Sequence, residues 1–231
     1  MIKYIFCTLI LHFISPCIIE AEETVFCLHG FMRTSRCMKK MGGAFRNEGY
    51  ETNLWGYPSR DKYIEEHAKQ LVIDLNKTAS EHPGESIHFV THSLGGIILR
   101  AALNLEGCPN EAKIGRAVLL SPPNQGSCFA KSLGKSIVMR KVLGDKAGKQ
   151  LYVSENFEHL GQFPKTMKVQ IISGTLGYNP FISEPNDGKV GVSEACLSTE
   201  HSHITFSCGH SWIMQSRKVI NSSVSFIGSQ L

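Results

Sequence analysis

Phe89-Val90-Thr91-His92-Ser93-Leu94-Gly95-Gly96 is the stretch that decides the fold of this 231-residue chain. The apolar run Ile87 to Val90 before it predicts a buried strand, and apolar residues at helical spacing follow from Ile97 to Leu105. The two glycines lack side chains, so the strand and the helix can approach each other closely. A tight strand-to-helix turn of this kind holds one hydroxyl in an exposed, strained position. We therefore predict that Ser93 is a nucleophile.

Composition indicates one ordinary globular domain. The chain is 42% hydrophobic and 19% charged, and 231 residues suit a single domain with a substantial core. The net charge of +4 is small, and its lysines form no basic stripe with interleaved aromatic residues. We therefore expect no nucleic-acid partner.

Strand and helix signals alternate along most of the sequence. Strands are expected at residues 23–28, 51–57, 87–90, 114–120, 169–173 and 203–207, and helices at 35–47, 64–79, 97–105 and 213–226. This rhythm predicts the α/β class, with a mostly parallel sheet covered by helices on both faces. Residues 126–165 interrupt it with weak helical patterns around Val138 and Tyr152, and we expect them to form a short cap.

The N-terminus predicts an export signal. Lys3 provides a positive end, Ile5 to Ile14 is apolar, and Ala21 suits the residue before a cleavage point. Residues 1–21 would then be removed and 22–231 would form the exported domain. A permanent membrane anchor and a buried first strand are the alternatives, but the apolar run is too short to span a bilayer comfortably.

Six cysteines follow this segment: Cys27, Cys37, Cys108, Cys128, Cys196 and Cys208. An even number in an exported protein permits up to three disulfides, with no pairing favoured. Cys27 lies on a predicted strand and also suits a small core residue.

A nucleophilic serine needs a histidine base, and that histidine needs a carboxylate to hold its tautomer. Asp187 lies in an Asp-Gly turn after the strand at 169–173, and His210 follows the strand at 203–207. Carboxyl ends of parallel strands share one edge of a sheet, so we predict a Ser93, Asp187 and His210 triad there. Glu184 and Glu194 are the alternative acids.

The remaining histidines are ranked by their place in the chain. His92 adjoins Ser93, so its side chain must leave the turn in another direction, and we expect it to line the substrate pocket. His201 and His203 lie at the start of the last strand, away from the catalytic edge. With Cys208 and His210 they form a loose set of metal ligands without a second, distant pair, and we expect no metal.

Backbone N–H groups must stabilise the oxyanion of an acyl-transfer reaction. Leu94 follows the nucleophile and supplies one amide. His29-Gly30-Phe31 follows the first core strand, where glycine allows a sharp turn, and the Phe31 amide is the expected second donor. We also place His29 beside the pocket.

Taken together, several ordered motifs resemble the bacterial lipase/esterase-type α/β-hydrolases over roughly Glu23 to Gly228. They are Leu28-His29-Gly30-Phe31, Tyr57-Pro58-Ser59, Val90 to Gly96, Ser121-Pro122-Pro123-Asn124-Gln125-Gly126-Ser127, Asp187-Gly188-Lys189-Val190 and Gly209-His210-Ser211. The resemblance implies the same Ser93, Asp187 and His210 triad and places Gln125 at the pocket. Two departures are Thr91, where the family's turn usually has glycine, and a short cap.

The sequence therefore predicts a serine hydrolase that cleaves carboxylic esters, with a small ester or lipid as substrate and no cofactor. Contact with a lipid surface is left open, and the sequence does not set the oligomeric state. An acyltransferase with the same triad and a non-catalytic binding protein of the same fold are the alternatives.

Overall fold

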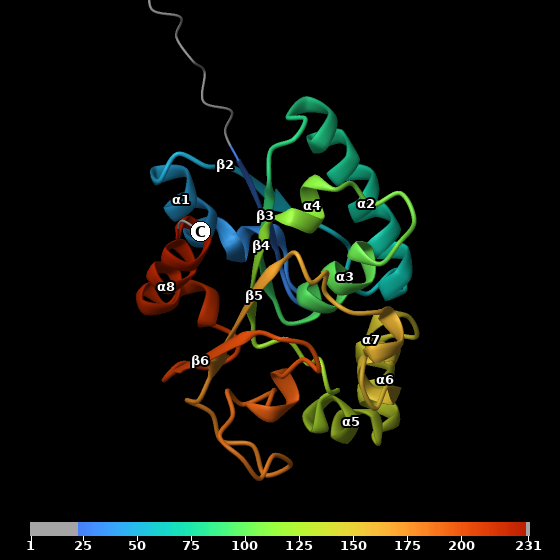
Figure 1. The fold of residues 1–231 in the computed structure, drawn as a ribbon. Helices are drawn as coiled ribbons and strands as arrows, with labels where there is room; N and C mark the ends of the chain where they lie inside the picture. Colours follow the sequence, from blue (N-terminus) through green and yellow to red (C-terminus); the bar gives the residue numbers. More distant parts are fainter. Residues whose placement is uncertain (1–22, 230–231) are drawn as a thin grey trace, which may run out of the picture.

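The computed structural model describes residues 23–229, so the expected export signal at 1–21 lies outside the described residues. Six parallel strands form one sheet in the order β2-β1-β3-β4-β5-β6 (Figure 1). The strands are Thr24–Leu28 (β1), Glu51–Trp55 (β2), Ile87–His92 (β3), Arg116–Leu120 (β4), Lys168–Gly174 (β5) and Ser202–Phe206 (β6). Every strand expected from the sequence is present, and the predicted α/β class is confirmed.

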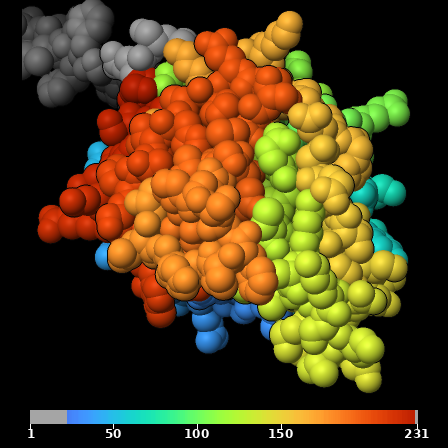
Figure 2. Space-filling view, turned by 90° about the horizontal axis from the view of Figure 1, so that it is seen from below, coloured from blue at the N-terminus to red at the C-terminus, as the bar shows by residue number. Residues whose placement is uncertain are grey.

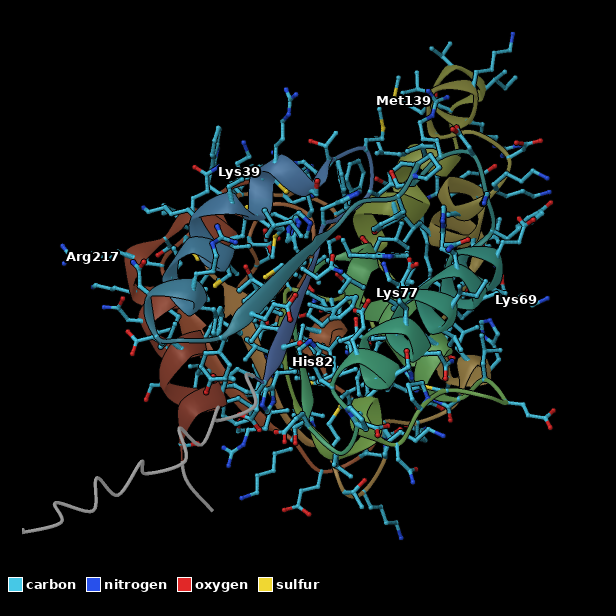
Figure 3. The ribbon with its side chains drawn as sticks, turned by 90° about the horizontal axis from the view of Figure 1, so that it is seen from above. Lys39, Lys69, Lys77, His82, Met139 and Arg217 are labelled. Atoms are coloured by element: carbon cyan, nitrogen blue, oxygen red, sulfur yellow. The ribbon has the colours of Figure 1, made fainter. Side chains whose placement is uncertain are left out.

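Helices cover both faces of the sheet (Figure 1). One face carries Lys39–Asn47 (α1) and Arg217–Gly228 (α8), and the other carries Ile64–Glu81 (α2), Leu94–Leu103 (α3) and Glu111–Ile114 (α4). Seen from above (Figure 3), Lys69 on α2 and Arg217 on α8 lie at opposite outer edges of these layers. Short 3-10 helices connect the larger elements, at Ser35–Met38, Glu158–Leu160, Ser193–Ala195 and Ile213–Gln215.

Side chains alternate between the two faces along each central strand, as a period of two requires. On β1, Val25 and Cys27 pack toward α1 and α8, whereas Phe26 and Leu28 pack toward α2 and α3. All four are fully buried. This double burial explains why β1 and β4 consist almost entirely of apolar residues.

Two of the boundaries that differ from the expected ones have a clear local cause. The helix after β3 begins at Leu94 rather than at Ile97, because Ser93 itself forms the residue before its first turn. The closing helix was expected at 213–226, but Ser216 has an extended backbone that separates a 3-10 turn from α8.

The stretch expected to form a cap folds into three short helices, Cys128–Gly134 (α5), Ile137–Leu143 (α6) and Ala147–Val153 (α7). Ser127 and Ser136 begin the first two helices and accept hydrogen bonds from backbone N–H groups in the first turn. Seen from below (Figure 2), this cap lies beside the orange segment between β5 and β6. The Ser127 hydroxyl joins the two through a 2.9 Å hydrogen bond to the Lys189 carbonyl.

Within residues 23–229 the six cysteines are free thiols, so the structure contains none of the disulfides that the cysteine count permits. Cys27 is a buried core residue, as expected for a small side chain on a central strand. No helix of the described residues has both the length and the apolar character needed to cross a bilayer.

Replacing Gly95 tests the close packing between β1 and α3. A Cβ at Gly95 would lie 2.7 Å from the His29 carbonyl oxygen and 2.9 Å from the Leu28 Cβ. We expect Gly95→Ala to lower the free energy of unfolding by about 1–3 kcal/mol, as overpacking of a core does. Chemical denaturation of the variant measures this change.

Gly43→Ala provides the matched control, because a Cβ there would meet only the tip of Arg46 at 3.9 Å. Alanine in an open helical position should leave stability unchanged or raise it by about 0.5–1 kcal/mol. Equal stability of the two variants would contradict the close packing described for Gly95.

Candidate active site

Ser93 occupies the strained turn that the sequence predicts. Its backbone has φ 53° and ψ −120°, a left-handed conformation that few residues other than glycine adopt. The Ser93 amide donates a 2.9 Å hydrogen bond to the Leu120 carbonyl, which holds the turn against β4. The turn thus places Ser93 at the carboxyl edge of the sheet, between β3 and α3.

Thr91 fits the position where a glycine is more usual because Gly96 has no side chain. A Cβ at Gly96 would lie 3.1 Å from the Thr91 Oγ1 and 3.2 Å from the Pro122 Cβ. The buried Thr91 hydroxyl has no hydrogen-bond partner among the described residues. Such a group typically costs about 1–3 kcal/mol, so the threonine is accommodated sterically at an energetic cost.

The loop after β1 packs directly on the serine turn. A Cβ at Gly30 would lie 2.7 Å from the His92 Nδ1 and 3.1 Å from the Ser93 Cβ, so this position requires glycine. Two hydrogen bonds hold the loop: the Tyr57 hydroxyl donates to the His29 carbonyl at 2.6 Å, and the Met32 amide donates to the Ser59 Oγ at 2.9 Å.

The two expected oxyanion donors, Phe31 and Leu94, directly follow Gly30 and Ser93 in the chain. Phe31 lines the same cavity as Ser93. The Leu94 side chain is buried in the core, whereas its amide begins α3, where the first N–H groups have no partner inside the helix. Helix N-termini of this kind favour negative charge.

Asp187 and His210 form a buried hydrogen-bonded pair. The His210 Nδ1 lies 2.7 Å from the Asp187 Oδ2, and both side chains are almost completely buried. The other carboxylate oxygen accepts hydrogen bonds from the amides of Lys189 and Val190 at 3.0 and 2.9 Å. The His210 amide also donates to the Asp187 carbonyl at 2.9 Å, so backbone and side chain fix the pair together.

The surroundings of Asp187 keep it ionised. Burial alone raises the pKa of this carboxyl, but the hydrogen bond and charge of His210, with the hydroxyl of Ser121 and the Lys189 amide, bring the pKa below its usual value. An ionised carboxylate accepts the proton on the His210 Nδ1. The Nε2 is then the nitrogen that can take up a further proton.

The two alternative acids are engaged elsewhere. Glu194 accepts hydrogen bonds from the amides of Cys128 and Gly191 at 2.6 and 2.8 Å. Glu184 accepts from the amide and hydroxyl of Ser193. Of the three acids considered from the sequence, Asp187 is the one that contacts His210.

His92 lines the cavity, as expected. Its Nε2 lies 3.0 Å from the His210 carbonyl oxygen, and the two rings are 4.7 Å apart. Burial, followed by the charges of His210 and Arg33, holds the pKa of His92 well below its usual value, so its ring is neutral. The His92 ring therefore contacts the backbone of His210 and packs against its side chain.

His29 and Gln125, which were expected at the substrate pocket, do not line the cavity at Ser93. His29 is fully buried, stacks on Tyr57 at 4.1 Å and accepts a hydrogen bond from the Tyr57 amide. Gln125 is turned toward the loop of the acid, where its Nε2 donates to the Cys196 carbonyl at 3.1 Å. Both residues hold the loops that surround the site.

The cavity above the serine has a volume of about 280 Å³ and is mostly apolar. Ser93, His92 and His210 lie on its wall together with side chains of the cap: Phe129, Ala130, Leu133, Met139, Val142, Leu143 and Leu151. A nucleophile and base beside an apolar hollow match the usual composition of a small-molecule site.

Sequence reasoning missed the role of Ser121. This residue follows β4 with φ 43°, and its Oγ accepts a 3.3 Å hydrogen bond from the Gly174 amide. This hydrogen bond connects the residue that follows β4 to the last residue of β5. Its position immediately before Pro122, at the end of a predicted strand, could have indicated this role.

No model of a known protein family matches the chain, and no curated protein matches it. Solved structures do match this chain. The lipase BlEst2 of Bacillus licheniformis in its propeptide form aligns with a TM-score of 0.76 and 18% identity, covering 92% of this chain and 51% of that one. This chain therefore spans about half the length of that form.

Two further structures give the same result. The mature form of BlEst2 aligns with a TM-score of 0.67 and 19% identity over 90% of both chains. Aspergillus fumigatus lipase B aligns with a TM-score of 0.66 and 13% identity over 90% of this chain and 53% of its own. The parallel sheet, the covering helices and these neighbours together show that the chain has the α/β-hydrolase fold, as the sequence motifs predicted.

His67 provides a test of the packing around Tyr57, because their rings are 4.8 Å apart. Burial, with a smaller contribution from Lys62, lowers the pKa of His67 from 6.5 to about 4. Between these two pH values the unfolded chain binds a proton that the folded chain rejects, so stability falls as the pH falls. We expect the wild type to lose on the order of 2 kcal/mol more than His67→Gln across this window.

Denaturant titrations at pH 7 and at about pH 4 measure this difference. His159→Gln, which replaces an exposed histidine, should keep the full pH dependence of the wild type. An identical pH dependence in His67→Gln and in the wild type would show that His67 is not held neutral by burial.

Proposed function

We propose that this protein hydrolyses carboxylic esters with Ser93 as nucleophile, His210 as general base and Asp187 as the group that orients the base. The observation that carries the proposal is the buried Asp187–His210 pair beside the same cavity as Ser93. Three side chains from separate loops share one edge of the sheet, which chance placement does not explain.

The first half-reaction forms an acyl-enzyme. His210 Nε2 takes the proton of the Ser93 hydroxyl as its oxygen attacks the ester carbonyl carbon. The carbonyl oxygen becomes an oxyanion, which the amides of Phe31 and Leu94 stabilise. The C–O bond of the alcohol then breaks, and the alcohol leaves with the proton from His210.

The second half-reaction regenerates the enzyme. Water gives a proton to His210 Nε2 and attacks the acyl carbon, and the Ser93 oxygen leaves with that proton as the carboxylic acid is released. Asp187 remains ionised throughout, since its pKa lies below the usual value. It stabilises the imidazolium that forms in both halves.

The cavity supports an ester with an apolar acyl chain. Its wall consists largely of aliphatic and aromatic side chains of the cap, while the polar groups gather at the serine. The names of the neighbouring structures, which include lipases and a metagenomic carboxyl esterase, agree with this substrate class. The hydrolytic activity, the role of each residue and the acyl specificity are our proposal for this chain.

Replacing the triad residues tests this mechanism with a short-chain nitrophenyl ester. Ser93→Ala and His210→Ala should each lower kcat by about 10⁶-fold, since serine and histidine act as a unit. Asp187→Asn should lower it by about 10⁴-fold, because the neutral amide favours the wrong tautomer. Initial rates at saturating substrate measure all three.

Ser132→Ala is the control, because the Ser132 hydroxyl donates to the Phe129 carbonyl and does not line the cavity. It should retain the wild-type kcat. Hydrolysis that persists in His210→Ala at the wild-type rate would overturn the assignment of the base.

Ala130→Phe tests whether the cavity holds the acyl chain. Ala130 lies in its wall, and a phenyl group there would occupy part of the 280 Å³. We expect kcat/KM to fall by about 10-fold or more for esters of long acyl chains but to change little for acetate, since each displaced methylene loses its burial energy. An equal fall for all chain lengths would place the acyl chain elsewhere.

A further inference from the structure

Cys196, His201 and His203 form a compact cluster outside the candidate active site. Cys196 follows the 3-10 turn Ser193–Ala195, and the two histidines lie at the beginning of the edge strand β6. One donor atom from each residue, a thiol sulfur or a ring nitrogen, lies within 4.8 Å of the other two. All three residues are partly buried.

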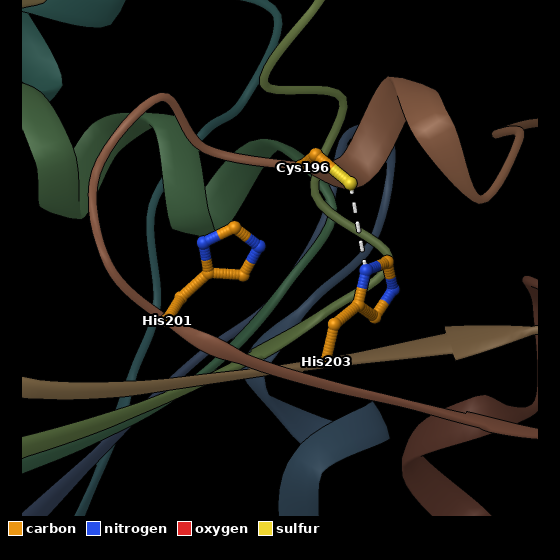
Figure 4. Close-up of side chains that lie close together, drawn as sticks. All are labelled: Cys196, His201 and His203. Carbon is orange, nitrogen blue, oxygen red and sulfur yellow. Dashed lines mark hydrogen bonds between the residues drawn. The ribbon is translucent and has the colours of Figure 1, made fainter.

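The spacing of these donors suits tetrahedral coordination. The Cys196 Sγ lies 3.5 Å from the His203 Nδ1. Zinc–sulfur and zinc–nitrogen bonds of about 2.3 and 2.0–2.1 Å at a tetrahedral angle give an S···N separation of about 3.5 Å. Figure 4 shows the His201 ring turned so that one nitrogen faces Cys196 and His203.

The non-coordinating nitrogen of each imidazole has its own oxygen partner. The His203 Nε2 lies 2.9 Å from the Ser173 Oγ, and the His201 Nδ1 lies 2.7 Å from the Thr199 carbonyl. The Thr199 carbonyl can only accept, so it fixes the Nδ1 proton on His201, and the Ser173 hydroxyl can accept the Nε2 proton of His203. The lone pairs then lie on the His203 Nδ1 and the His201 Nε2, the nitrogens that face the thiol.

We infer that Cys196, His201 and His203 bind one divalent transition-metal ion of the zinc class. Thiolate and imidazole are both donors that suit zinc, whereas magnesium and calcium take oxygen donors. The Cys196 thiol gives its proton to solvent on binding. A solvent molecule completes the tetrahedron, since His201 also borders a hollow lined by Thr199, Glu200 and Ser202.

The metal connects the segment after β5 to the edge strand. Asp187 lies in that segment, and β6 continues through Cys208 into His210. A bound ion therefore stabilises the part of the chain that carries two of the proposed catalytic residues, although it contacts neither. The grouping differs from the loose set considered from sequence, because Cys196 replaces Cys208 and His210.

Cobalt binding to the reduced full chain tests this site, because Co²⁺ occupies zinc sites and reports thiolate ligation by a charge-transfer absorption band. We expect one equivalent of Co²⁺ to produce the band in the wild type and Zn²⁺ to displace it. Cys196→Ser should abolish the band. Ser173→Ala should keep it but weaken the affinity by about 10–100-fold, as loss of an outer-shell partner does.

Cys37→Ser and His159→Gln are matched controls that leave the cluster intact and should bind cobalt as the wild type does. Alkylation of the wild type provides a measurement that needs no variant: Zn²⁺ should slow iodoacetamide labelling of Cys196 but not of the exposed Cys128. Absence of the band in the wild type, its survival in Cys196→Ser, or unprotected labelling of Cys196 would each overturn the inference. None of these results depends on ester hydrolysis.

Discussion

At the carboxyl edge of the sheet, the loop after β1 and the turn after β3 pack so closely that Gly30 and Gly95 have no space for a side chain. This contact holds the loop that carries Phe31 against the turn that carries Ser93. Tyr57 stabilises the arrangement through the His29 carbonyl and by stacking on the His29 ring. A strained serine persists here because its surroundings determine its backbone conformation.

The acid and the cap are fixed by a second set of contacts. Glu194 accepts hydrogen bonds from Gly191, near the Asp187 turn, and from Cys128, at the start of α5. Ser127 donates to the Lys189 carbonyl in the same turn. Hydrogen bonds thus connect the cap that lines the cavity to the loop that carries Asp187.

The six strands and the loops that carry Ser93, Asp187 and His210 could be predicted because buried parallel strands are rich in apolar residues and functional loops follow their ends. The roles of Glu184 and Glu194 could not be predicted, because the three acids lie in one loop and differ only in which backbone amides donate hydrogen bonds to them. His29 was placed in the pocket from its position after a strand, whereas stacking on Tyr57 buries it. The cluster of Cys196 with His201 and His203 could not be predicted either, because these residues come together only where the chain reverses direction before β6.

We propose that the Asp187–His210 pair activates Ser93. Labelling with a fluorophosphonate, followed by intact-mass and peptide mass spectrometry, tests it most directly, because this reagent reacts with an activated serine hydroxyl. We expect one label per chain, located on Ser93 and absent from His210→Ala. Wild-type protein that stays unlabelled, or that carries its label on another serine, would contradict it.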